Sequence, residues 1–505
     1  MPSVTSITGI TVGDIGPKMA YNSSDNGFLH LDHYRIPRLN MLMKHARVAP
    51  DGTYMRPPHA KVGYSAMIHV RAHMIRHQAM YASMAMTTAI RYSAIRRQGE
   101  ITPNAGEVKI LDYQTQQYRL FPQLARIFAF MFTGHSVKNI YMRVQRDVAK
   151  GKVDEMAELH YITSGLKSVV THLCGEATSQ ARMSCGGHGY SKASNIPELY
   201  GVAIGGCTYE GENMVMLQQL ARYLMRAAKA AKSGKTLSTL VEYLVKPHET
   251  HSLIDKDPKI APFLCYTGHL LAFEWAARRQ IMKAYERLQS LVSKGLSQEE
   301  AWNQNAVELN RVALFLCYTG HLLAFEWAAR RQIMKAYERL QSLVSKGLSQ
   351  EEAWNQNAVE LNRAARLHTK LYIAHTFYDR VQTIINVPCK EVLEDLLHLH
   401  LNYELIDIAY YLLEDGYLSS QQFSYMKEDM YRLLAKIRPN AVSIIDSWDY
   451  SDHELRSVLG RRDGHVYENL YKWAQESELN RTQVPPLFEK YLKPMMKEAR
   501  QLSKM

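Results

Sequence analysis

The chain has 505 residues, of which 46% are hydrophobic and 22% charged, the balance of a globular protein with a sizeable core. Its formal net charge is +12, but acidic residues are interspersed with the basic ones and no recognised nucleic-acid-binding motif occurs, so we expect no nucleic-acid partner. No apolar stretch is long enough for a transmembrane segment, and the first residues do not resemble a signal peptide. The six cysteines lack CxxC spacing, so we predict neither a metal site nor disulfide bonds.

The first part of the chain reads as strand and the remainder as helix. Residues 27–38 alternate between apolar and polar side chains, follow the turn residues "NSSDNG" and end near a proline, which predicts a strand. Apolar residues then recur at spacings of three and four, which is typical of amphipathic helices. The expected helices span residues 64–98, 110–132 (interrupted or kinked at Pro122), 155–175, and from Glu210 to about 233.

The segment "SGKTLST" at 233–239 is a candidate linker, and a second helical region follows it to the C-terminus. Within that region, residues 263–311 recur letter for letter as 315–363. Functional repeats usually diverge, so two identical copies indicate a recent duplication or a mis-joined gene model, and we favour the second. We expect one copy to pack in the core and the other to lie outside it. Ser297, or its copy Ser349, is predicted to cap a helix.

Glu210, in "GGCTYEGENMV", has three possible roles: a helix cap, a surface charge or a general base. A carboxylate just before a helix is stabilised by the unpaired N–H groups there, so a cap would suffice as an explanation. Arg96 is equally ambiguous, because a cation at the end of a helix interacts favourably with the helix dipole. His73 and His77 lie four apart on one helix face, but the glutamate of HExxH is missing, so we predict no metal there.

The surrounding motifs narrow these alternatives. The stretches "CGGHGYSK", "CTYEGENMVMLQQLARYLM", "AIRYSAIRRQ", "ILDYQTQQYRLFP" and "IRPNAVSIIDSWDYSD" closely resemble the acyl-CoA oxidases of peroxisomal fatty-acid β-oxidation, which are relatives of the acyl-CoA dehydrogenases. The resemblance implies a mainly α fold: remnant strands of a β domain at 1–55, an acyl-CoA dehydrogenase-like helical bundle at 56–235, and a second, C-terminal helical domain at 236–505. Dehydrogenases lack that last domain, which favours an oxidase.

The resemblance also implies a chemistry. These enzymes are FAD flavoproteins that convert acyl-CoA to trans-2-enoyl-CoA, and molecular oxygen then reoxidises the flavin, giving hydrogen peroxide. The family's base corresponds to Glu210, and Gly211 lets the backbone approach the substrate. The positions that correspond to the family's cofactor contacts are Arg96, Gln114, Gly186, Gly187 and Asn213.

The family pattern further implies a homodimer in which Arg96 reaches the partner's cofactor. The terminal triplet Ser503-Lys504-Met505 differs in one residue from the peroxisomal signal Ser-Lys-Leu, so we expect recognition by the peroxisomal import receptor. Compared with the family, the chain begins partway through the central β domain. The alternative hypothesis is therefore a truncated, inactive helical fragment or dimerisation partner; an acyl-CoA dehydrogenase is a third.

Overall fold

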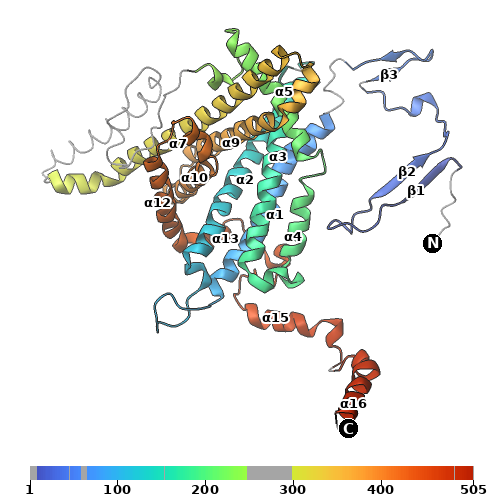
Figure 1. The fold of residues 1–505 in the computed structure, drawn as a ribbon, viewed down its shortest axis with the longest axis vertical. Helices are drawn as coiled ribbons and strands as arrows, with labels where there is room; N and C mark the ends of the chain where they lie inside the picture. The colour runs from blue at the N-terminus through green and yellow to red at the C-terminus, as the bar shows by residue number, and fades with distance from the viewer. Residues whose placement is uncertain are drawn as a thin grey trace.

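A computed structural model describes residues 8–44, 46–57, 65–152, 154–246, 298–482 and 484–503. The predicted mainly α fold is confirmed: helices form the body of the molecule, and short strands lie beside it (Figure 1). Within these ranges, no helix combines the length and the apolar character needed to cross a bilayer.

The strands form two small antiparallel pairs. β1 (Ile10–Asp14) pairs with β2 (Gly27–Leu31), with Ile10 opposite Leu31, and β3 (Arg47–Val48) pairs with β4 (Tyr54–Met55). The predicted strand at 27–38 therefore ends early. His33 adopts a left-handed conformation with φ 52°, which breaks the extended backbone after Leu31.

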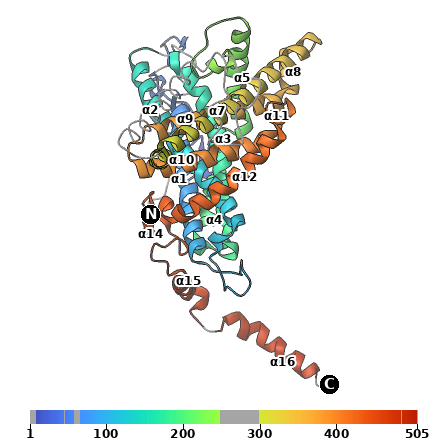
Figure 2. The same cartoon turned by 90° about the vertical axis from the view of Figure 1, so that its left-hand side faces the viewer.

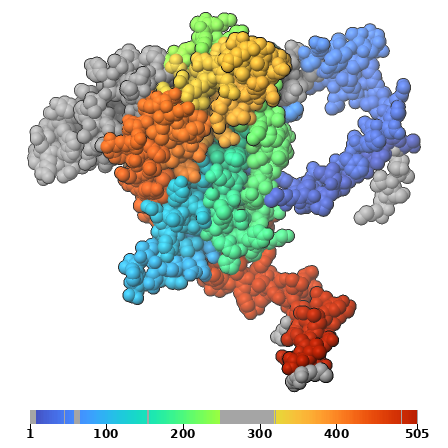
Figure 3. Space-filling view, viewed as in Figure 1, coloured from blue at the N-terminus to red at the C-terminus, as the bar shows by residue number. Residues whose placement is uncertain are grey.

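The loop between β1 and β2 joins this hairpin to the helices. Ala20 is buried against α4 (Ile196–Gly205), where a Cβ atom on Gly201 would lie 3.0 Å from that of Ala20. The ring of Tyr21 meets that of Tyr209 edge to face, with centroids 6.3 Å apart. The tip of the hairpin loop thus packs beside the turn that contains Glu210, while the strands extend away from the body (Figure 3).

The first helical region is a bundle of long helices. α1 (Ser65–Ile95) packs against α2 (Gln114–Ala149) and α3 (Asp154–Ser184), and α5 (Asn213–Lys232) packs against α3. Small residues allow close contact: a Cβ atom on Gly134 of α2 would lie 2.9 Å from the backbone nitrogen of Arg76 on α1. Of the interruption or kink predicted at Pro122, the interruption is wrong, because α2 continues through it, while the kink stays a prediction. A proline removes one helical hydrogen bond, and Pro122 is buried among residues that hold the helix together.

The second helical region packs directly on the first. Buried residues of both regions form one continuous hydrophobic core, with α9 against α2 and α5, and α10 and α12 against α2 (Figure 2). The helices of this region are α7 (Gln298–Ser345), α8 (Gln350–Gln356), α9 (Ala358–Gln382), α10 (Val387–Asp407), α11 (Ala409–Glu414), α12 (Ser420–Ile437), α13 (Ala441–Asp446) and α14 (Asp452–Leu455).

The second copy of the repeat, 315–363, occupies this core. Tyr318 and Phe325 on α7 are each 1% exposed. Ser349 caps α8: its hydroxyl oxygen accepts a hydrogen bond from the backbone nitrogen of Glu352, and the Glu352 carboxylate accepts one from the backbone nitrogen of Ser349. The predicted cap is therefore confirmed for this copy. Residues 263–297 of the first copy, Ser297 included, lie outside the described residues.

The C-terminal residues extend from the body as an arm. α15 (Val466–Gln475) begins near the end of α1, and α16 (Lys493–Leu502) lies at the tip of the arm (Figures 1 and 2). Ser503 follows α16 and is exposed, whereas Lys504 and Met505 lie outside the described residues. The recognition of this triplet by an import receptor stays a prediction.

Candidate active site

A tight turn connects α4 to α5 and carries Glu210. Glu210 and Gly211 both have positive φ angles, 57° and 103°. The left-handed conformation suits glycine but is unfavourable for glutamate, so contacts around the turn must stabilise it. Glu210 is half-buried, and among the described residues its carboxylate takes part in no ion pair and its backbone N–H in no internal hydrogen bond.

The helix cap that the sequence suggested for Glu210 belongs to Glu212. The carboxylate of Glu212 accepts hydrogen bonds from the backbone nitrogens of Met214 at 2.9 Å and Val215 at 3.2 Å, the first turn of α5. Glu212 thus satisfies N–H groups that the helix leaves unpaired. This excludes the capping role for Glu210.

Two buried cations hold the backbone of the turn. Arg71 on α1 is 4% exposed, and its Nε donates to the carbonyl oxygen of Glu210 at 2.9 Å. Lys167 on α3 is fully buried, and its Nζ donates to the carbonyl oxygen of Gly211 and to Oδ1 of Asn213. Burial lowers the pKa of Lys167 to about 8. Sequence reasoning missed both residues; the one signal was a lysine inside the otherwise uncharged stretch "ITSGLKSVV".

The side chain of Asn213 is engaged with α3. Its Oδ1 accepts from Lys167 at 3.0 Å and its Nδ2 donates to Oγ1 of Thr171 at 3.0 Å, while Oγ of Ser168 donates to its carbonyl oxygen at 3.0 Å. Both ends of the carboxamide therefore have partners inside the protein. A place for Asn213 beside the cofactor stays a prediction, and in this structure the residue secures the turn.

The other predicted cofactor residues gather at the opposite end of the bundle. Arg96 follows the last turn of α1, and its guanidinium donates to the hydroxyl of Tyr467 at 2.9 Å and to Oε1 of Gln98 at 2.6 Å. Gly186 and Gly187 begin the short helix η4 (Gly186–Tyr190), and a Cβ atom on either would meet open space. Open backbone and a partly exposed guanidinium are groups that can bind phosphate.

Gln116, which the sequence analysis did not single out, ties these helix ends together. Its Nε2 donates to Oγ of Ser93 near the end of α1 at 3.0 Å and to the carbonyl oxygen of Ser184 at the end of α3 at 2.9 Å. Gln114 begins α2 two residues earlier and is exposed. The ends of α1 and α3 and the start of α2 are therefore held in one place.

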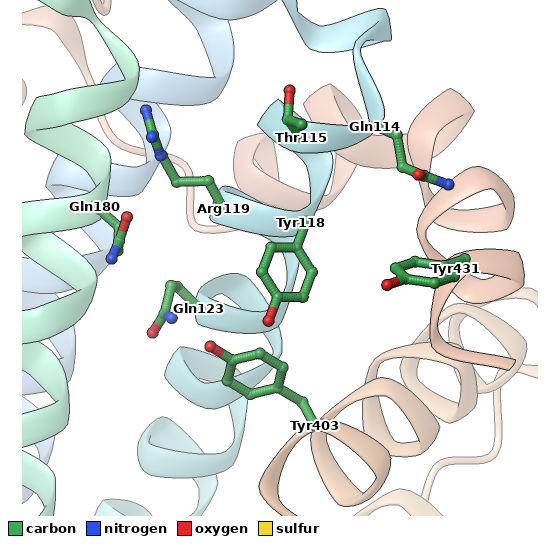
Figure 4. Close-up of a pocket in the computed structure, with 8 residues that line it drawn as sticks. All are labelled: Gln114, Thr115, Tyr118, Arg119, Gln123, Gln180, Tyr403 and Tyr431. Atoms are coloured by element: carbon green, nitrogen blue, oxygen red, sulfur yellow. The ribbon is translucent and has the colours of Figure 1, made fainter. Parts of the chain in front are cut away.

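Gln114 also lines a cavity of about 430 Å³ (Figure 4). Tyr118 on α2 and Tyr403 on α10 meet edge to face inside it, with ring centroids 6.1 Å apart, and the guanidinium of Arg126 lies 4.8 Å from the Tyr403 ring. The remaining lining residues are polar or aromatic: Thr115, Arg119, Gln123, Gln180 and Tyr431. The cavity is open and lined by side chains that can form hydrogen bonds. Of the predicted cofactor residues, Gln114 lines it.

The predicted site residues thus form two separate groups. Arg71, which touches Glu210, and Arg96 lie 25 residues apart along α1 and its last turn. At a rise of 1.5 Å per residue, this separation is roughly 37 Å. Glu210, Gly211 and Asn213 lie at one end of the bundle, and Arg96, Gln114 and the two glycines at the other.

Comparison with known proteins identifies the family of the chain. The family model for the acyl-CoA oxidase C-alpha1 domain matches residues 64–225, and the acyl-CoA oxidase model matches 267–322 and 318–497, one segment starting in each copy of the repeat. The chain is 39% identical to peroxisomal acyl-coenzyme A oxidase 1 of Rattus norvegicus over 489 residues, 97% of the chain and 67% of the relative.

The chain belongs to the acyl-CoA oxidase family.

Other relatives agree. Acyl-coenzyme A oxidase acox-1.1 of Caenorhabditis elegans is 52% identical over 497 residues, 98% of the chain and 65% of the relative. The crystal structure of acyl-CoA oxidase-1 from C. elegans, complexed with FAD and ATP, superimposes with a TM-score of 0.81 at 50% identity, covering 97% of the chain and 65% of that structure. That of C. elegans acyl-CoA oxidase-2, bound with FAD, ascaroside-CoA and ATP, gives 0.82 at 48% identity, covering 98% and 65%. The chain therefore spans about two thirds of these relatives' length.

Proposed function

We propose that the protein is an acyl-CoA oxidase that desaturates acyl-CoA to trans-2-enoyl-CoA with FAD and passes the electrons to oxygen, forming hydrogen peroxide. The observation that carries this proposal is the turn at Glu210. Among the described residues the Glu210 carboxylate forms no hydrogen bond or ion pair, two buried cations fix the carbonyls of Glu210 and Gly211, and the neighbouring Glu212 already serves as the cap. A carboxylate that is oriented but unpaired is what a general base requires.

The residues of the turn can divide the work between proton transfer and charge stabilisation. Glu210 would take the α-proton of the thioester, and its own backbone N–H would donate to the thioester oxygen as enolate charge develops. The positive φ of Gly211 shapes the backbone beside this donor. When bound, FAD supplies the acceptor for the β-hydride.

The chain fits the charged part of this cofactor. Arg96 offers a partly exposed guanidinium, Gly186 and Gly187 leave space for close backbone approach, and Gln114 offers a carboxamide at the cavity rim. These groups lie too far from Glu210 to contact the diphosphate of a flavin that Glu210 serves within the same chain. We therefore infer a homodimer in which each flavin contacts Glu210 of one chain and Arg96 of the other.

A peroxisomal location agrees with this chemistry. The rat, mouse and guinea-pig relatives are named peroxisomal acyl-coenzyme A oxidases. Hydrogen peroxide is a product that such a compartment handles. We propose the same location for this protein, with the import receptor as its partner there.

The direct test is spectroscopic. The purified protein should carry flavin absorbance, and anaerobic addition of an acyl-CoA should bleach it. Admission of oxygen should restore the absorbance and release peroxide in equal amount. Bleaching that oxygen does not reverse would instead indicate a dehydrogenase, and a protein without flavin or peroxide formation would contradict the proposal.

A further inference from the structure

We infer that Lys167 is a positioning residue for the reaction: from within the bundle, it holds the turn of Glu210 and Gly211 in its left-handed conformation. This inference rests on the proposed role of Glu210 as the base. Lys167 itself does not touch the reacting atoms. It acts through the carbonyl oxygen of Gly211, the residue that follows the base.

Among the described residues, the side-chain hydrogen bonds of Lys167 both go to the turn. Its ammonium donates to the carbonyl oxygen of Gly211 and to Oδ1 of Asn213, and Ser168 and Thr171, on the same helix α3, bond to Asn213 as well. Three polar residues within about one turn of one helix, Lys167, Ser168 and Thr171, thus bind the segment from 211 to 213. A fully buried lysine is costly unless hydrogen bonds compensate it, so these contacts indicate a specific use.

The hydrogen bonds from Arg71 and Lys167 stabilise an unfavourable backbone conformation. Two successive residues with positive φ are unfavourable when one of them is glutamate, and the turn would relax without partners for its carbonyls. Arg71 fixes the carbonyl of Glu210 and Lys167 fixes that of Gly211. Because a trans peptide is planar, its N–H points away from its carbonyl. The N–H groups of Gly211 and Glu212 are therefore directed away from the two cations.

The experiment compares Lys167→Met with Thr163→Val. Thr163 is a buried polar residue one turn earlier on α3, and its hydroxyl donates to the carbonyl oxygens of Leu159 and His160 and not to the turn. In Lys167→Met, we expect amide hydrogen exchange within residues 206–213 to accelerate at least about tenfold, the effect of losing a hydrogen bond to a charged group, while α1 and α2 stay protected. Thr163→Val should leave exchange in the turn unchanged.

Kinetics provide the second measurement. Lys167→Met should lower kcat by about tenfold or more, with a smaller change in the KM for acyl-CoA, because the base is misplaced while the substrate contacts remain. Lys167→Gln, which keeps a donor without the charge, should recover part of both effects. If Lys167→Met lowers thermal stability but changes neither exchange in the turn nor kcat, the lysine is merely structural and the inference is wrong.

Two further outcomes are decisive. If Lys167→Met does not fold, Lys167→Gln takes its place, and unchanged exchange and kcat in that variant overturn the inference. The exchange measurement needs neither flavin nor substrate. If the wild-type protein shows no oxidase activity, the proposed function fails, while exchange still reports whether Lys167 holds the turn.

Discussion

Glu210 and Glu212 are two residues apart; the structure places Glu212 at the N-cap of α5, and we propose Glu210 as the base. We predict that Glu210→Gln keeps the fold and lowers turnover by roughly 10²–10⁴-fold, the loss expected when a general base is removed. The measurement is steady-state peroxide production together with the flavin spectrum. An activity loss below about tenfold would contradict the assignment.

Glu212→Gln is the matched control for that experiment. Glutamine keeps an oxygen that can accept from the first turn, so removal of the charge should lower the free energy of unfolding by only about 0.3–1 kcal/mol and leave turnover close to that of the wild type. Thermal unfolding measures the first effect and peroxide production the second. If Glu212→Gln is the variant that abolishes turnover, the base has been placed two residues too early.

Lys167 also makes stability depend on pH. Burial lowers its pKa from 10.5 in the unfolded chain to about 8 in the folded protein. Between these values the unfolded state binds more protons, so this residue makes the free energy of unfolding rise as pH increases from 8 to 10.5. The charged and titratable groups that face it are Cys207, Arg71, Glu212 and Glu210.

We predict that replacing Lys167 weakens the pH dependence of stability. In Lys167→Met, the rise in unfolding free energy between pH 8 and 10 should be smaller than in the wild type, because the titrating group is gone. Denaturant unfolding at several pH values provides the data. Equal pH dependence in both proteins would show that Lys167 titrates at its ordinary pKa in the fold.

At the level of helices, a buried ion network joins the two helical regions. Glu404 on α10 pairs with Arg126 on α2 and, at 2.7 Å, with Lys370 on α9, and all three are nearly inaccessible. Burial alone would raise the pKa of Glu404, but Arg126 and Lys370 hold it well below its ordinary range. The network therefore keeps its carboxylate charged inside the core.

We predict that Glu404→Gln lowers the free energy of unfolding by about 3–5 kcal/mol, because two buried cations lose their shared carboxylate. The control is Glu338→Gln, which breaks the exposed pair between Lys232 on α5 and Glu338 on α7. That change should cost less than about 1 kcal/mol. Denaturant unfolding measures both losses in free energy. Equal losses in the two variants would show that the buried ion pairs contribute no more to stability than the exposed pair.

The repeat allows a second test at this level. Deleting residues 263–314 and deleting residues 312–363 produce the same amino-acid sequence, because the two copies are identical. The product keeps one copy, which can occupy the place that 315–363 fill beside α9. We predict that it folds with unchanged or improved solubility, as judged by circular dichroism and gel filtration. Loss of folded protein would show that both copies are structural.

The sequence predicted the main helices because their apolar residues recur along one face for many turns. It did not predict the continuity of α2 through Pro122, since tertiary packing there outweighs the lost hydrogen bond. The length of the strand at 27–38 was overestimated, because the alternation of apolar and polar residues does not reveal that His33 has a left-handed backbone conformation. Glu210 was found through its motif. Lys167 and Arg71 were not, because their contacts to the turn join segments 44 and 139 residues apart.

At the level of the whole molecule, the proposed dimer makes each active site a product of two chains. We predict that Arg96→Ala and Glu210→Gln are each defective alone but complement each other in mixed dimers. A mixed dimer contains one site with both groups intact. Random mixing should therefore recover about a quarter of wild-type activity, since half of the dimers are mixed and half of their sites are intact.

The measurement is peroxide production after co-expression of the two variants or after subunit exchange. As a control, Glu210→Gln mixed with a second variant of the same residue should recover nothing. If Arg96 and Glu210 served the same site within one chain, the Arg96→Ala and Glu210→Gln mixture would also stay inactive, and the crossed arrangement would be wrong.

Arg71 and Arg96 are joined by the unbroken helix α1, which ends at Ile95, and this has a consequence for how the sequence can change in evolution. Inserting one residue between them would turn everything beyond it by about 100° and shift it by about 1.5 Å. The Arg96 guanidinium would then move away from the hydroxyl of Tyr467. We therefore expect that this stretch accepts amino-acid replacements but no gain or loss of residues, whereas the loop at 99–109 can vary in length among relatives.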